Sequence, residues 1–330
     1  MSRVATMGAR SAAAPRMLRR LAGNAAPRRS YSAASPELLL RCSGCGSLVD
    51  GLSEPAFKCL ESDSGPADVD HVLVPQPVAG SPDHTSLNPF VRYRSRLYSH
   101  RVAMARGMED HRYVAMVENI DNALAQIDGT GFKETPLLYD EDLNVFAKDE
   151  SANVGQSHKA RHLQNVMIYL QVLKLTSTDD SLSQRRLAVA SCGNAGLAAA
   201  TVAAAAEWPI DVCIPEGADE SVVQRLEELG AHIHMCGRDG VPVSTVFGEI
   251  STQGAADPTL AVCRSLVAEH GSIPFSVQGP ECGLAVEGGK VSPPLPRRCI
   301  LPRNLTNLFP SGHHHFCLLC CIRNQLLVCV

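Results

Sequence analysis

Apolar residues recur at helical spacing in two long stretches of the chain, residues 113–127 and residues 159–175. In the second stretch they are Leu163, Val166, Met167, Leu170, Leu173 and Leu175. Spacings of three and four residues place such side chains on one face of a helix. Both stretches are therefore predicted to be amphipathic helices.

Beyond residue 187 short apolar runs alternate with helical patterns. Strands are predicted over residues 143–148, 187–190, 210–214, 232–236 and 273–277, and helices over residues 194–207, 219–229 and 258–270. Asp219 is the expected N-cap of its helix and Gly230 the residue just beyond its end. Strands that alternate with helices indicate an α/β fold, in which parallel sheets are flanked by helices. In such folds ligands bind beyond the carboxyl ends of the strands.

Composition and charge exclude several classes of partner. The chain has 330 residues, 45% of them hydrophobic, and a formal net charge of −4. That balance argues against a nucleic-acid partner. The longest apolar stretch near the end, residues 316–330, is short and contains Arg323 and Asn324, so no membrane span is predicted.

Residues 1–35 differ in composition from the rest of the chain. They are rich in Arg, Ala and Ser, and no acidic residue occurs before Glu37. This composition predicts an organelle transit peptide, disordered and removed after import. Mitochondrial localisation is expected, with the plastid as the alternative; a basic tail without a targeting role is the competing interpretation.

Residues 36–87 form a cysteine-bearing segment followed by a linker. Cys42 and Cys45, followed by glycine, have the spacing of half a zinc ribbon, and Cys59 is the third cysteine. The nearest further ligands are Asp68, Asp70 and His71. Because a second close pair is missing, a ribbon without metal is favoured and no metal site is predicted. Residues 61–88, rich in Pro, Asp, Ser and Gly, are expected to be a linker or surface loop.

Lys159 lies at the expected start of the second amphipathic helix. Gly155 suits a tight turn before it, and Ser157 is the expected N-cap. The positive end of the helix dipole disfavours a cation there, which favours the neutral, reactive amine. From the pattern alone, a solvated lysine in the first turn of a helix is the favoured interpretation.

Two motifs together resemble fold type II pyridoxal-phosphate (PLP) enzymes. The first is Ser157-His158-Lys159-Ala160-Arg161, and the second is Ser191-Cys192-Gly193-Asn194, which precedes Ala195 and Gly196. The family includes threonine synthase, threonine dehydratase, cysteine synthase and the tryptophan synthase β-subunit. The resemblance covers residues 88–290 and implies two α/β lobes, of which the second is incomplete.

The resemblance assigns a role to each motif. PLP is the implied cofactor and Lys159 the catalytic lysine that forms the aldimine with it. Asn194 would hydrogen-bond the pyridine-ring hydroxyl, although a plain helix cap is the alternative. The loop formed by Ser191, Cys192, Gly193, Asn194 and Ala195 would bind the substrate carboxylate. Cys192 itself is expected to be a small buried filler, and Arg161 is expected to pair with Asp149 or Glu150.

Further elements are similar to threonine synthase within this family. They are Asn88-Pro-Phe-Val-Arg-Tyr, Thr135-Pro136-Leu137 and the cysteine-bearing segment. The implied reaction converts O-phosphohomoserine and water to threonine and phosphate. His158 stands where threonine synthases commonly have phenylalanine, whereas tryptophan synthase β-subunits have His-Lys there, so the substrate assignment stays open. A PLP-dependent ammonia-lyase acting on threonine or serine is the alternative, because the loop from Ser191 to Asn194 fits both reactions. The substrate is thus a small amino acid, and the family resemblance favours a homodimer.

The end of the chain departs from the family pattern. The glycine-rich loop that holds the PLP phosphate in this family has no counterpart in the sequence, and residues 291–330 change abruptly toward Pro, Cys and His. These residues are interpreted as an out-of-family, disordered tail. An inactive truncated family member is therefore a third interpretation. The cluster of His313–His315 with nearby cysteines lacks the spacing of a closed zinc site.

Overall fold

The computed structural model describes residues 36–52, 55–62, 70–140, 145–238, 240–291 and 328–329. The predicted transit peptide and almost all of the predicted tail lie outside these residues. Among the described helices, none has the length and apolar character required to cross a membrane. The helices are η1 Pro36–Leu38, α1 Pro89–Arg92, η2 Arg94–Arg96, α2 Tyr98–Ala105, α3 Asp110–Asp128, η3 Val154–Gln156, α4 Lys159–Thr176, α5 Ser181–Gln184, α6 Asn194–Ala205, α7 Glu220–Glu228, α8 Pro258–Ala268 and η4 Gly283–Lys290.

The strands assemble into four small sheets. They are β1 Leu39–Cys42, β2 Leu48–Asp50, β3 Leu73–Pro75, β4 Leu137–Asp140, β5 Val145–Lys148, β6 Leu187–Ala190, β7 Ile210–Pro215, β8 His232–Cys236, β9 Val243–Thr245, β10 Gly248–Ile250, β11 Ile273–Pro274 and β12 Val328–Cys329. The predicted strands over residues 187–190 and 232–236 are confirmed with their predicted bounds, whereas the predicted strand over residues 273–277 is shorter.

A parallel sheet with the strand order β11-β6-β7-β8 forms the centre of the α/β part. Its register pairs Val189 with Val212 and Val212 with Ile233. Strands β6 and β7 are buried along most of their length, as expected for strands covered on both faces. The predicted parallel sheet and its α/β class are confirmed.

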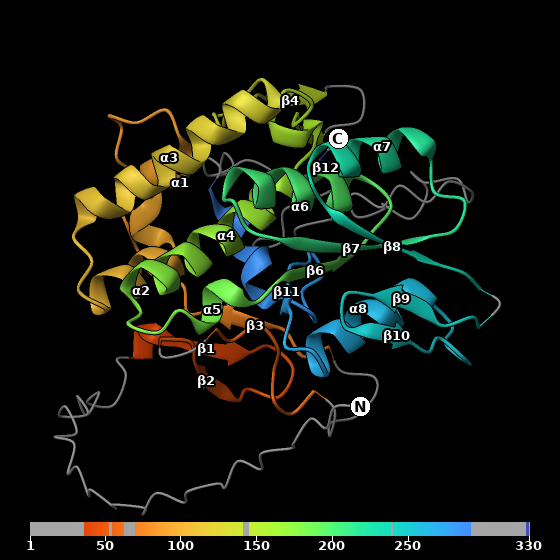
Figure 1. Cartoon of the computed structure of the whole chain (residues 1–330). Helices are drawn as coiled ribbons and strands as arrows, with labels where there is room; N and C mark the ends of the chain where they lie inside the picture. The colour runs from red at the N-terminus through yellow and green to blue at the C-terminus, as the bar shows by residue number, and fades with distance from the viewer. Residues whose placement is uncertain are drawn as a thin grey trace, which may run out of the picture. The chain divides into compact units, whose positions relative to one another are not determined.

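Different elements cover the two faces of this sheet (Figure 1). Helix α6 packs on one face, where Ala199 and Val202 join Val212 in the main core. Helix α8 and the β9–β10 hairpin cover the other face, where Val262 and Leu266 pack with Cys213. Helix α7 begins after Asp219, whose carboxylate accepts a hydrogen bond from the Ser221 N–H, and Gly230 follows with φ +73°, as predicted.

Helix α4 is buried along most of its length. It packs against α2, α6 and η4. Its polar residues Arg161, His162, Gln164 and Asn165 are buried together with its apolar ones. The prediction of an amphipathic helix is therefore wrong for α4, because chain segments distant in sequence cover the face that the local pattern leaves to solvent.

The N-terminal residues form an antiparallel sheet of order β2-β1-β3. Strand β3 falls within the segment that was predicted to be a linker. It pairs with β1, and its residue Leu73 is fully buried in the core. Leu40 and Leu73 belong to the same core cluster as Leu163 of α4. The Tyr169 hydroxyl of α4 donates a hydrogen bond to the Gly51 carbonyl at 2.6 Å. This small sheet is thus part of the body that carries α4.

Candidate functional site

A tight turn precedes Lys159, the first residue of α4. Gly155 and Gln156 have φ of +63° and +49°, so the predicted turn at Gly155 is confirmed. The N-cap of α4 is His158, and no side chain caps the helix. The prediction of Ser157 as N-cap is therefore wrong. A Cβ built at Gly155 would lie 3.8 Å from Ala198, which shows that this turn packs directly on α6.

A buried ion pair fixes the first turn of α4. Arg161 Nε lies 2.6 Å from Glu150 Oε2, and both side chains are almost fully buried. The Thr135 hydroxyl donates to the other oxygen of Glu150 at 2.5 Å, and Lys148 Nζ lies 3.9 Å from that oxygen. Of the two acids expected to pair with Arg161, the structure therefore selects Glu150. Lys159 itself is half-buried.

Two histidines near Lys159 remain uncharged at neutral pH. Burial, together with the positive charge of the neighbouring Lys159, lowers the pKa of His158 to about 3. Burial is also the main cause that lowers the pKa of His162, whose Nδ1–H donates to the Ala285 carbonyl at 2.7 Å. The neutral histidines add no charge beside the lysine.

The second motif forms the loop between β6 and α6. The Ser191 N–H donates to the Cys213 carbonyl of β7 at 3.1 Å, which fixes the start of the loop. A Cβ at Gly196 would lie 2.2 Å from the Ser191 carbonyl oxygen, so only glycine permits this close return of the chain. Asn194 opens α6 and is exposed, and the first N–H groups of that helix have no carbonyl partners within it.

A cavity of about 410 Å³ lies at the carboxyl ends of β6, β7 and β8. Its lining includes Ser191, Cys192 and Gly193, together with Arg238 and Asp257. This is where parallel α/β sheets bind ligands. Lys159, Asn194 and Ala195 do not line the cavity, so the structure joins only part of the predicted site around it. Cys192 is exposed, which contradicts its expected role as a buried filler.

Arg238 is a residue that the sequence motifs did not reveal. It follows β8 and brings a positive charge to the cavity formed by the 191–193 loop. The same charge helps to lower the pKa of Asp257, although the main cause is the hydrogen bond from Thr259. The signal available in the sequence was its position just beyond a predicted strand of the parallel sheet.

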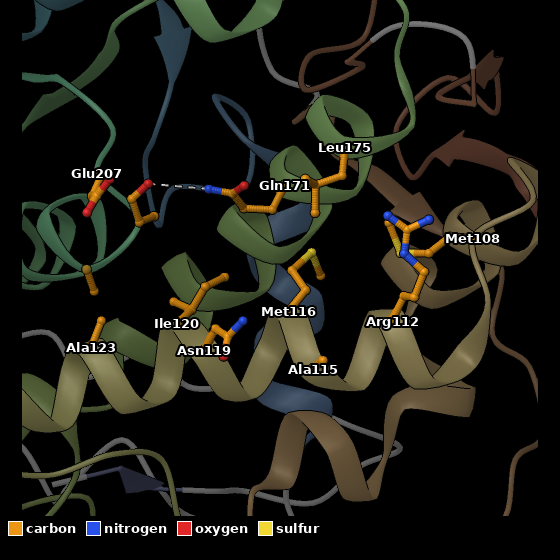
Figure 2. A pocket seen from close by; sticks show the side chains of 12 residues that line it. Met108, Arg112, Ala115, Met116, Asn119, Ile120, Ala123, Gln171, Leu175 and Glu207 are labelled. Atoms are coloured by element: carbon orange, nitrogen blue, oxygen red, sulfur yellow. Dashed lines mark hydrogen bonds between the residues drawn. The ribbon is translucent and has the colours of Figure 1, made fainter.

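A second cavity, of about 500 Å³, lies between α3 and the carboxyl-terminal ends of α4 and α6 (Figure 2). Met116 and Ile120 of α3 face Gln171 of α4, whose amide donates to the Ala206 carbonyl at 3.4 Å. Lys159 and Asn194 stand at the opposite ends of these helices, about 18 Å away at 1.5 Å per residue. This cavity is therefore separate from the predicted site.

The surroundings of Lys159 fit a polar ligand such as PLP. Three nearby polar atoms, Asn153 Oδ1, Ser157 Oγ and His158 Nε2, are buried without a hydrogen-bond partner within the described part of the chain. Buried polar atoms are normally satisfied, so atoms of this kind suit a bound group. The lysine and the 191–195 loop fit the cofactor, while the sequence offers no glycine-rich loop for its phosphate.

Several solved structures resemble the chain over part of its length. Maize serine racemase is 19% identical with a TM-score of 0.34, and the match covers 53% of this chain and 47% of that one. Threonine deaminase isoform 2 from Solanum lycopersicum is 14% identical with a TM-score of 0.34, and the match covers 56% of this chain and 48% of that one. Diaminopropionate ammonia lyase from Escherichia coli is 16% identical with a TM-score of 0.34, and the match covers 53% of this chain and 49% of that one. The chain spans about half the length of each, and at these TM-scores nothing further rests on them.

No curated protein matches the chain. The family model described as "Pyridoxal-phosphate dependent enzyme" matches residues 130–280. That range contains Lys159, the buried Glu150–Arg161 pair, the 191–195 loop and the parallel sheet. Members of this family bind pyridoxal 5'-phosphate. Over residues 130–280 the chain is therefore similar to the pyridoxal-phosphate dependent enzyme family.

Proposed function

We propose that the protein acts on a small amino acid with PLP as cofactor and Lys159 as the residue that binds it covalently. The observation that carries this proposal is the setting of Lys159, at the start of a buried helix and near buried polar atoms that have no hydrogen-bond partner among the described residues. PLP, when bound, withdraws electrons from the Cα atom of an amino-acid substrate. The remaining work belongs to side chains and backbone groups of the chain.

The proposed roles follow from position. Lys159, as a neutral amine, would take a proton from the substrate Cα atom and return it. The free N–H groups at the start of α6 and the 191–193 loop would bind the substrate carboxylate. Arg238, on the same cavity, would add a positive charge to that end of the site. The Arg161–Glu150 pair positions the first turn of α4 and hence the lysine.

The cofactor assignment is tested on the full chain incubated with PLP and then reduced with borohydride. Mass spectrometry of the digested protein should find the reduced cofactor on Lys159. Lys159→Ala should abolish this labelling. Lys174→Ala, on the exposed last turn of the same helix, is the matched control and should leave it unchanged. Labelling that persists in Lys159→Ala would exclude the proposed lysine.

Two reactions compete for the substrate assignment. Threonine synthase-like chemistry is supported by the resemblance of Thr135-Pro136-Leu137 and of the cysteine-bearing segment, in which Thr135 and Cys42 are buried. An ammonia-lyase is supported by the loop from Ser191 to Asn194, which fits both reactions, while His158 departs from the phenylalanine common in threonine synthases. Release of phosphate from O-phosphohomoserine would establish the first. Release of ammonia and a 2-oxo acid from threonine or serine would establish the second.

A further inference from the structure

Four potential metal ligands converge in the N-terminal sheet. They are Cys42, Cys45, Cys59 and His71, and their ligand atoms all lie within 4.8 Å of one another. Cys42 Sγ is 3.5 Å from His71 Nδ1, and Cys45 Sγ is 3.6 Å from Cys59 Sγ. The sequence had shown the first pair and Cys59 but had not selected a fourth ligand from among Asp68, Asp70 and His71. The fold selects His71.

Backbone pairing creates this cluster. Strand β1 pairs with β3 so that Cys42 stands opposite Leu73, which brings His71, two residues earlier, beside Cys42. A tight turn then brings Cys45 close to Cys42. In this turn the Gly46 N–H donates to the Cys42 carbonyl at 3.0 Å, and the Cys42 N–H donates to the Ser47 carbonyl at 2.8 Å. Gly46 adopts φ +78°, which glycine permits.

Two of the six separations between the four ligand atoms match those of a tetrahedral zinc site. With Zn–S bonds of about 2.3 Å and Zn–N bonds of about 2.0 Å, ligand sulfurs lie about 3.7 Å apart and a sulfur lies about 3.5 Å from a nitrogen. The observed separations of 3.6 Å and 3.5 Å agree with both values. A disulfide would need a sulfur–sulfur distance of about 2.05 Å.

Three of the four residues of the cluster are buried, and a thiol alone is a weak hydrogen-bond partner for the buried His71 ring. Cys42, Cys59 and His71 are 1%, 2% and 5% exposed. The His71 ring has the Cys42 thiol next to Nδ1, and its Nε2 is buried with no hydrogen-bond partner within the described residues. Because a thiol is a weak donor and a weak acceptor, it compensates poorly for burying an imidazole.

We propose that Cys42, Cys45, Cys59 and His71 bind one structural zinc ion. The three thiols lose their protons on binding, and His71 binds through Nδ1. Four protein ligands close the coordination sphere, so the site holds structure and leaves no position for a substrate. Ser47, whose hydroxyl is 3.0 Å from Cys45 Sγ, donates a hydrogen bond to that thiolate.

The zinc site holds the segments that support η4 and, through it, α4. The Gly283 N–H of η4 donates to the carbonyl of Phe57, two residues before Cys59, at 3.1 Å. A Cβ at Gly283 would lie 2.0 Å from the carbonyl oxygen of Leu73, two residues after His71. Element η4 in turn accepts hydrogen bonds from His162 and Asn165 of α4. The metal thus stabilises the layer on which the Lys159 helix rests.

The first experiment measures zinc in the full-length protein purified without metal affinity. Cys45→Ser is the decisive variant, because this ligand is exposed and its replacement leaves the core intact. Wild type should contain about one zinc ion per chain more than Cys45→Ser. Cys192→Ser, at an exposed cysteine far along the sequence, is the matched control and should keep the metal. Equal zinc in wild type and Cys45→Ser would overturn the proposal.

A second measurement needs no variant. X-ray absorption at the zinc edge of the wild-type protein should show three sulfur ligands at about 2.3 Å and one nitrogen at about 2.0 Å, as expected from the ligand set. A shell of nitrogen and oxygen alone would overturn the proposal. A disulfide between Cys45 and Cys59 would also overturn the proposal, because it excludes the metal. Mass spectrometry would detect this disulfide as a protein mass lower by two hydrogens and as a cross-linked pair of peptides that contains both cysteines.

The structural role has its own readout. Removing the metal with a chelator should increase hydrogen exchange in η4 and in the first turns of α4, as well as in β1 and β3. Exchange in α8, on the far face of the parallel sheet, should change little. If exchange rises in β1 and β3 only, the metal does not support the Lys159 helix, and this part of the proposal is wrong.

Discussion

His158, directly before Lys159, couples stability to pH. The unfolded chain binds a proton at this histidine below about pH 6.5, whereas the buried side chain has a pKa of about 3. The unfolded state therefore binds more protons between these values, and the free energy of unfolding falls as the pH decreases. Each pH unit in that range costs up to about 1.4 kcal/mol.

Replacing this histidine should flatten the pH dependence. His158→Phe removes the proton uptake, so the variant should lose less stability than wild type between pH 7 and pH 4. Denaturant titrations at several pH values measure this difference. His111→Phe, at an exposed histidine, should follow the wild-type curve. Parallel curves for wild type and His158→Phe would mean that His158 is protonated equally in both states.

Glu150 and Arg161 form the buried ion pair beside the lysine. Arg161→Met should destabilise the protein by about 3–5 kcal/mol, because Glu150 then remains buried without its main partner. The double variant Glu150→Leu, Arg161→Met should recover much of this loss. Arg225→Met, in an exposed pair with Glu228, should change stability by less than about 1 kcal/mol. If Arg161→Met and Arg225→Met lost the same amount of stability, burial would not be the reason for the effect at Arg161.

At the scale of elements, α4 depends on a close contact with η4. A Cβ at Gly288 would lie 2.4 Å from the Arg161 carbonyl oxygen, so Gly288→Ala should push the two elements apart. The expected loss of stability is about 1–3 kcal/mol, the usual cost of overpacking. Gly193→Ala is the control, because φ at Gly193 is −132° and no atom lies within 4 Å of its built Cβ. Thermal unfolding of both variants tests this contact.

At the scale of the whole molecule, the N-terminal sheet should unfold together with the parallel sheet. Strands β1, β2 and β3 are too short to be stable alone, and Leu40 shares one core with Val189 of β6. Hydrogen exchange at increasing denaturant should therefore expose the amides of β1 and β6 at the same concentration. Exchange of β1 at clearly lower denaturant would show that the N-terminal sheet is a separately folding unit.

Local pattern was sufficient for the elements of the parallel sheet. Residues 187–190 are apolar and bounded by polar turns, so their strand appears with its predicted bounds. Asp219 and Gly230 likewise act through short-range hydrogen bonding and backbone conformation. Strand β3 and the burial of α4 could not be predicted in this way, because both depend on chain segments distant in sequence.

The sequence by itself determined the α/β class, the two motifs and the resemblance to pyridoxal-phosphate dependent enzymes, since periodicity and motif spacing are properties of the local chain. Only the tertiary structure decided which acid pairs with Arg161, that Arg238 joins the 191–193 loop, and that His71 completes the cysteine cluster. Each of these depends on the distance between residues far apart in sequence. Strand pairing and core packing fix such distances, and neither can be read from local spacing.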